Sequence, residues 1–209
     1  MDYLMSTPVG KTELNLIKSE GASLGYLAES QAGCTANVAL VVGNVLYVAN
    51  TGDSRCVLSS KGQAVEMSID HKPGDPKETE RILKAGGFIT AQGRVNGNLN
   101  LSRALGDFEF KANPALPVDE QLIIAVPDVR KRTLTPDDEF IVLGCDGIWE
   151  VKTNQFIIDF VGTRLKKEIL PSRIAEELLD TLLAPDSSSK DSYFRFFVLT
   201  KSRCSWDRM

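Results

Sequence analysis

The secondary structure of the first half of the chain follows from residues 35–68, TANVALVVGNVLYVANTGDSRCVLSSKGQAVEMS. The two apolar runs TANVALVV and VLYVAN flank Gly43-Asn44, a pair of the kind that closes a two-residue β-hairpin. Two further β-like runs, CVLS and AVEMS, flank a turn at residues 60–62. The pattern therefore predicts an antiparallel meander.

A helix is expected directly after this meander. Asp75 can act as its N-cap, Pro76 suits the first turn, and Glu78 can reach back to complete a capping box. Gly86, followed by a second glycine, is expected to end the helix.

The second half contains more strand-like pieces and then two helices. Apolar residues at helical spacing predict helices over residues 156–165 and 174–183. Strands grouped first and helices later favour an α+β fold, in which helices pack on an antiparallel sheet or β-sandwich. The strand-like pieces lie at residues 88–102, 122–125, 129–133 and 140–145.

Composition limits the class of protein. The 209 residues fit one domain, and 24 basic against 28 acidic side chains give a net charge of −4. This balance argues against nucleic acid as a partner, and no run approaches the roughly 18 apolar residues that span a membrane. The scattered Cys34, Cys56, Cys145 and Cys204 predict reduced thiols and a cytoplasmic or nuclear protein.

Aspartates beside glycines at strand ends are the most informative polar residues. Asp53 follows VLYVANTG, and Asp146 follows the apolar run FIVLGC. Carboxylates at the mouths of strands suit Mg²⁺ or Mn²⁺, which take oxygen ligands. The alternative is that each Asp-Gly or Gly-Asp pair only forms a turn. His71 is the single histidine, and it is interpreted as a loop residue rather than a catalytic base.

Several motifs together resemble one enzyme family. They are AGCTANVALV, VANTGDSRCVL, DHKPGDPKETERILKAGGFITAQGRVNGNLNLSRALGDFEFK and VPDVRKRTLTPDDEFIVLGCDGIWE, in that order. Through them residues 33–186 resemble the metal-dependent protein phosphatases, also called protein phosphatase 2C. GRVNGNLNLSRALGD and LPVDEQ are most similar to the gamma-type members.

The resemblance implies an α-β-β-α sandwich that hydrolyses phosphoserine and phosphothreonine in proteins. Two Mg²⁺ or Mn²⁺ ions would hold the attacking water. Asp146 matches a ligand of this pair of ions, and Asp53 matches an aspartate that helps to hold a weaker third ion. Arg55 and Arg103 are expected to support the loops, and Trp149 to anchor the core.

Further expectations concern the flap and the ends of the chain. Residues 70–111 correspond to a flap that bears on substrate choice. The family's Asp-Gly-His-Gly-Gly and Gly-x-Asp-Asn-Met-Thr motifs have no counterpart, although Asp186 and Asp191 lie near the place of the second. The expected organisation is a divergent segment, an incomplete catalytic domain and an atypical tail, at residues 1–32, 33–186 and 187–209.

These departures imply a truncated phosphatase chain with weakened metal binding, which acts as a monomer on a phosphoprotein substrate. Two alternatives remain open. One is a catalytically inactive pseudophosphatase or phosphoprotein-binding module, and the other is a nonfunctional fragment.

Overall fold

The computed structural model describes residues 1–22, 32–182 and 196–200. They belong to two compact units, one formed by Met1–Ala36 with His71–Pro127 and the other by Asn37–Asp70 with the chain from Asp128 onward. Within the described ranges, no helix combines the length and the apolar character that a membrane span requires.

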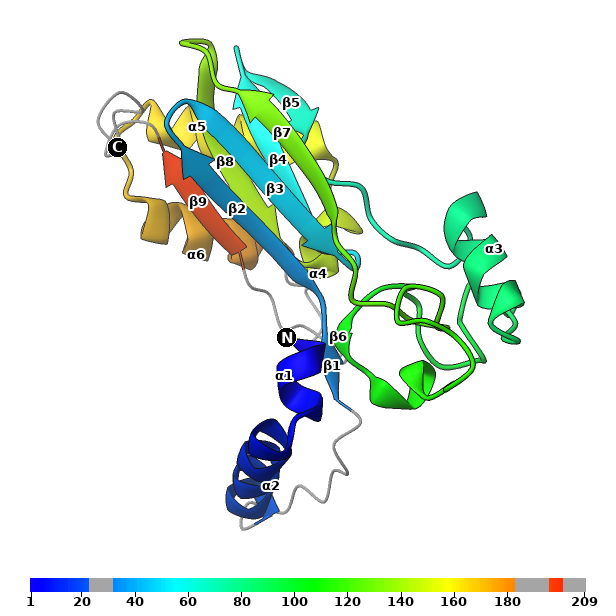
Figure 1. Ribbon diagram of the computed structural model, residues 1–209. Coiled ribbons are helices and arrows are strands. Elements are labelled where there is room, and N and C mark those ends of the chain that lie inside the picture. The colour runs from blue at the N-terminus through cyan, green and yellow to red at the C-terminus, as the bar shows by residue number, and fades with distance from the viewer. Residues whose placement is uncertain (23–31, 183–195, 201–209) are drawn as a thin grey trace. The chain divides into compact units, whose positions relative to one another are not determined.

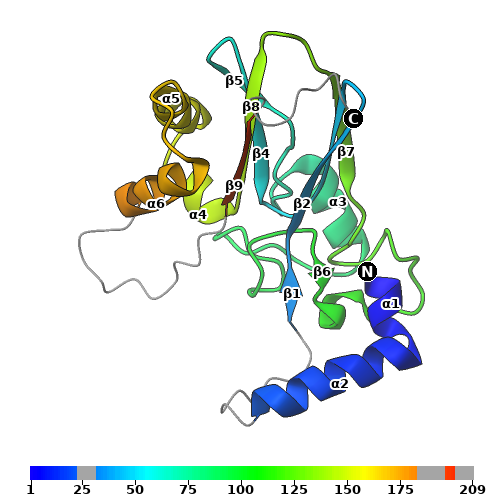
Figure 2. The same ribbon diagram turned by 90° about the vertical axis from the view of Figure 1, so that its left-hand side faces the viewer.

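The second unit contains two antiparallel sheets, which face each other in Figure 1 and are seen edge-on in Figure 2. One sheet has the order β2-β3-β7, and the other has the order β5-β4-β8-β9. The strands are β2 (Ala36–Val42), β3 (Val45–Thr51), β4 (Arg55–Ser60), β5 (Gln63–Glu66), β7 (Asp128–Thr133), β8 (Asp138–Gly144) and β9 (Phe196–Thr200).

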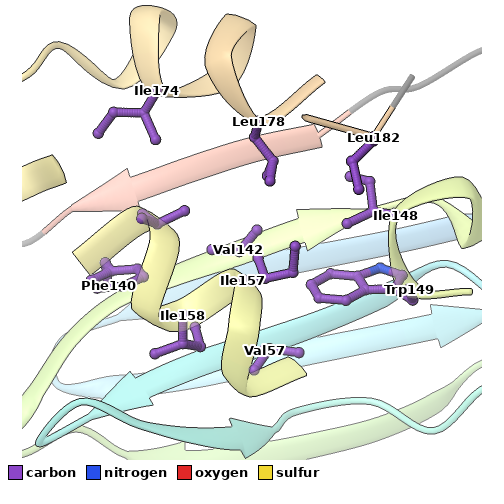
Figure 3. Packing of buried hydrophobic residues seen from close by; sticks show 11 residues of the cluster. Val57, Phe140, Val142, Ile148, Trp149, Ile157, Ile158, Ile174, Leu178 and Leu182 are labelled. Carbon is purple, nitrogen blue, oxygen red and sulfur yellow. The ribbon is translucent and has the colours of Figure 1, made fainter. Parts of the chain in front are cut away.

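Three helices, α4 (Asp146–Trp149), α5 (Asn154–Leu165) and α6 (Pro171–Leu182), follow β8 in the chain. The helices α5 and α6 cover the outer face of the four-stranded sheet (Figure 2). Figure 3 shows how the side chains of these helices meet those of β4 and β8, with Phe140 and Val142 of β8 between Leu178 and Ile158 in this view.

The strand β8 is buried on both of its faces, which explains its unbroken apolar run. Phe140 and Val142 belong to the core beneath the helices, whereas Ile141 and Leu143 belong to a second core that also includes Leu46 and other residues of the opposite sheet. Because side chains alternate along a strand, four consecutive apolar residues serve two cores. The expected α+β sandwich with packed helices is confirmed.

The first unit has a small core of its own, made of Ile82, Val95, Ala104, Phe110 and Ile123. Its elements are the helices α1 (Asp2–Ser6), α2 (Pro8–Ala22) and α3 (Pro76–Lys84), the 3-10 helix η1 (Phe108–Lys111), and the paired strands β1 (Gly33–Cys34) and β6 (Leu105–Gly106).

The strands expected at residues 88–102 and 122–125 are not formed, so this prediction is wrong. Those segments make only isolated bridges, such as Ile89 with Val95 and Arg103 with Ile124. Tight turns follow one another too closely for a ladder to extend, although the apolar side chains still enter the core.

The capping box expected at the start of α3 is also wrong. The Asp75 carboxylate accepts the Lys72 N–H instead of capping the helix. Glu78 points inward and is only 2% exposed, and it accepts hydrogen bonds from Arg81, Ser102 and Arg103. Burial opposes its ionisation, but these hydrogen bonds outweigh that effect and lower the pKa of Glu78 to about 2.

Candidate metal centre

The register of β4 and β8 places the two candidate ligands at one end of the four-stranded sheet. Arg55, the first residue of β4, lies opposite Gly144, the last residue of β8. Asp53 precedes Arg55 by two residues, and Asp146 follows Gly144 by two residues. Because the strands are antiparallel, the segments that carry both carboxylates leave the sheet at the same end.

The turn that carries Asp53 is held by a polar network beneath it. Gly52 has a φ of 105°, a conformation that glycine adopts without steric cost. The amide of buried Asn50 donates to the carbonyls of Gly52 at 2.9 Å and Ile69 at 2.8 Å. The amide of Asn37 donates to the Asn50 side-chain oxygen. Asp53 itself is 3% exposed, and the hydrogen bonds of Asn50 hold the turn on which it lies.

Arg55 braces the same end of the sheet. Its Nε and Nη2 donate to the two Asp70 carboxylate oxygens at 2.9 and 2.8 Å, and its Nη1 donates to Asn154 at 2.7 Å. The guanidinium lies 5.5 Å from the centroid of the Trp149 ring, a cation–π distance. The hydrogen bonds to Asp70 raise the pKa of Arg55. Its groups are thus engaged in holding three segments together, the supporting role that the sequence predicts.

Asp146 begins α4, directly beyond β8. One of its carboxylate oxygens accepts the N–H of the adjacent Gly147 at 2.8 Å, and the residue is partly exposed. Trp149 is 7% exposed, and its Nε1 donates to the Gly144 carbonyl at 2.8 Å. The indole therefore fixes the start of α4 against the end of β8, which confirms the expected core anchor. Glu150 is exposed.

The two remaining polar residues singled out from the sequence belong to the first unit. Arg103 is 2% exposed and binds Glu78, with a further hydrogen bond to the Val126 carbonyl. His71 is 3% exposed, and its backbone carbonyl accepts both the N–H and the hydroxyl of Ser102. These contacts join residues of the first unit to one another. The expected flap, from His71 onward, lies within this unit.

The donor chemistry suits a hard cation. Carboxylate oxygens are the ligands that Mg²⁺ and Mn²⁺ prefer, and Mg²⁺ commonly uses one or two carboxylates and completes its shell with water. In the part of the chain that the structure describes, no group of three or more His, Cys, Asp or Glu side chains is placed to hold a metal ion. Asp186 and Asp191 lie outside the described residues. Two carboxylates at one sheet end thus fit an ion that keeps much of its water.

Sequence reasoning missed Asn50 and Asp70, which position this end of the sheet. Asn50 ends the run VLYVAN and reads as an ordinary turn residue, and Asp70 lies 15 residues from its partner Arg55. The available signal was burial: an asparagine at an inward position of a strand needs hydrogen-bond partners.

Comparison with known proteins gives one consistent result. The family model described as Protein phosphatase 2C matches residues 10–191. The chain is 53% identical over 192 residues to protein phosphatase 2C 1 of Paramecium tetraurelia, covering 90% of this chain and 62% of that protein. It is 53% identical over 165 residues to protein phosphatase 1G of Bos taurus, covering 76% of this chain and 30% of that protein.

A solved structure agrees with the sequence matches. The crystal structure of a phosphatase from a pathogenic strain of Toxoplasma gondii superposes with a TM-score of 0.66 at 36% identity, covering 75% of this chain and 48% of that one. The chain therefore spans less than two thirds of the length of each of these proteins.

Proposed function

Because the chain belongs to the protein phosphatase 2C family, we propose that it carries part of a metal-dependent protein serine/threonine phosphatase. The reaction is hydrolysis of phosphoserine and phosphothreonine in a phosphoprotein substrate. The observation that carries the proposal is the register of Arg55 with Gly144, since the segments that carry Asp53 and Asp146 then leave the sheet at the same end. Similarity to protein phosphatase 1G supports the expected likeness to the gamma-type members.

In this proposal Asp146 and Asp53 would bind Mg²⁺ or Mn²⁺. When bound, the ion supplies an activated water and offsets charge on the phosphoryl oxygens. The chain's own contribution is to hold the two carboxylates in place: Asn50 fixes the turn of Asp53, and Trp149 fixes the helix of Asp146. A ligand shell made largely of water predicts weak metal binding by this chain.

The test is release of phosphate from a phosphothreonine peptide, with and without Mn²⁺. We expect manganese-dependent release that is lost in Asp146→Ala and retained in Asp137→Ala. Asp137 is a matched control, because it is a partly exposed carboxylate just before β8, at the end of the strand away from Asp146. A Mn²⁺ titration of the same variants separates loss of metal binding from loss of chemistry.

Two results would contradict parts of this proposal. Release that is unaffected by Asp146→Ala would contradict the assignment of this residue. A folded chain that binds the phosphopeptide without releasing phosphate, with or without Mn²⁺, would contradict the enzymatic proposal and favour a binding module.

A further inference from the structure

The strand β2 has a neighbouring strand on only one side among the residues that the structure describes. It lies at the edge of the sheet with the order β2-β3-β7 (Figure 1). Residues 37–42 of this strand, NVALVV, carry no charge and contain no proline. Charged side chains and proline are what normally keep an edge strand from pairing with another strand. The edge of β2 therefore lacks the usual protection.

The turn between β2 and β3 identifies which backbone groups of β2 face away from β3. The two-residue turn makes Val42 and Val45 a hydrogen-bonded pair, and such pairs alternate along antiparallel strands. The same count places Asn37 opposite Asn50, in agreement with the 2.9 Å hydrogen bond between their side chains. The residues between the bonded pairs direct their N–H and C=O groups to the free edge, and they are Asn37, Ala39 and Val41.

The side chains of β2 alternate between the core and solvent. Ala39 and Val41 pack against the core between the two sheets. Val38, Leu40 and Val42 are exposed on the opposite, outer face of the three-stranded sheet. A strand that pairs with this edge would therefore lie beside an apolar row, and apolar cross-strand pairs stabilise such a sheet.

The other edge of the same sheet has a different character. Its strand, β7, carries the three consecutive cations Arg130, Lys131 and Arg132. Two copies joined through β7 would bring these charges together, and like charges on adjacent strands are destabilising. Two copies joined through β2 bring together only uncharged residues. Association of this sheet with itself is thus opposed at β7 and favoured at β2.

We propose that β2 pairs antiparallel with β2 of a second copy of this chain, about a two-fold axis at Ala39. In this register Asn37 lies opposite the partner's Val41, and Val38 lies opposite the partner's Leu40. The outward N–H and C=O groups of residues 37, 39 and 41 then all find partners. The two sheets join into one of six strands, and both copies use the same surface, as a two-fold interface requires. The monomer expected from the sequence is the alternative that the test decides.

Sedimentation equilibrium of the full chain tests the association. We expect the mass to rise from 22.9 kDa toward twice that value as the concentration increases through the micromolar range, because one pair of strands gives a small interface. A mass that stays at 22.9 kDa would overturn the proposal. Growth beyond a dimer would also overturn it, because a two-fold pair is closed.

Two matched variants locate the interface. Val38 and Val129 are 59% and 60% exposed, but Val129 lies on β7, at the far side of the sheet. Val38→Lys places an ammonium group opposite the partner's Leu40 twice in each dimer, so it should raise the dissociation constant about tenfold or more. Val129→Lys should change it by no more than about twofold, because that side chain is remote from the interface. Equal effects of the two variants would overturn the proposal.

Cysteine pairs test the register and do not depend on how Val38→Lys behaves. Val38 and the partner's Leu40 form a pair without backbone hydrogen bonds, whose Cα atoms lie about 4.5 Å apart, a distance that a disulfide can bridge. Chains with Val38→Cys are mixed with chains with Leu40→Cys and oxidised, and mass spectrometry identifies the linked peptides. We expect the link between positions 38 and 40 to form several-fold more than the 38–38 and 40–40 links. Equal yields, or no link at these positions, would contradict the two-fold axis at Ala39.

Discussion

Replacement of Glu78 by glutamine tests the polar centre of the first unit. Glu78 accepts hydrogen bonds from Ser102 Oγ at 2.8 Å and Arg103 Nη2 at 2.6 Å, and it also binds Arg81. Arg103 is 2% exposed. Glu78→Gln keeps the size of the side chain but leaves two arginine charges without their counterion.

The expected loss of stability is large. Removing one partner of a buried ion pair costs about 3–5 kcal/mol, because the remaining charge stays desolvated. The matched control is Glu80→Gln on the same helix, where the carboxylate and its partner Lys84 are 73% and 74% exposed. An exposed pair of this kind contributes less than about 1 kcal/mol. Urea unfolding at pH 7 measures both losses, and hydrogen exchange of α3 assigns them to this unit.

The lowered pKa of Glu78 also predicts how the stability of the folded chain depends on pH. The pKa of Glu78 is lowered from an ordinary 4.5 to about 2, so its ionised form favours the folded state. This stabilisation is complete above pH 4.5 and is lost as the pH falls toward 2, and it amounts to about 3 kcal/mol at 1.36 kcal/mol per pKa unit. The difference in free energy of unfolding between the unmodified chain and Glu78→Gln should therefore become smaller as the pH falls from 4.5 toward 2. A loss of unfolding free energy in Glu78→Gln that is no larger than the loss in Glu80→Gln, or that does not change with pH, would refute the reasoning.

Three other outcomes follow from the described contacts. Cys56 is fully buried, and burial raises its pKa to about 12. A thiol reagent at pH 8 should therefore modify the exposed Cys34 but not Cys56, which mass spectrometry would show. Asn50→Ala should weaken Mn²⁺ binding about tenfold or more, measured by titration, because the turn that carries the candidate ligand loses its support. Ile148→Ala should lower the free energy of unfolding by about 2–5 kcal/mol, whereas Val151→Ala, at an exposed position, should change it by less than about 0.5 kcal/mol in the same urea titration.

The hairpins were predictable from the sequence because their causes are local. Gly43 adopts a φ of 59° in a two-residue turn, and the apolar alternation of the flanking runs sets which side chains point inward. The helices α5 and α6 were predictable for a similar reason, since each carries a stripe of residues such as Ile157 and Leu178 that is buried against the sheet.

The first unit shows where local reasoning fails. The tetrapeptide from Asp75 to Glu78 has the residues of a capping box, but Arg103 lies 25 residues further along the chain and draws the glutamate inward. Four hydrogen-bond donors from two arginines and a serine outweigh the one backbone N–H that a capping interaction offers. A short stretch of sequence around Glu78 does not include Arg103. The capping box was therefore predicted wrongly because a tertiary contact overrides the local preference.

The candidate metal centre depends on both local sequence patterns and the tertiary pairing of strands. The sequence predicts that Asp53 and Asp146 each follow a strand, but only the pairing of β4 with β8 shows that they leave the sheet at one end. That pairing closes a long loop that contains residues 71–127, which have their own apolar core. Loop-closure entropy grows only slowly with length, so such an insertion adds little to the cost of pairing. The geometry of the two carboxylates therefore depends on the register of the sheet, which local sequence patterns do not set.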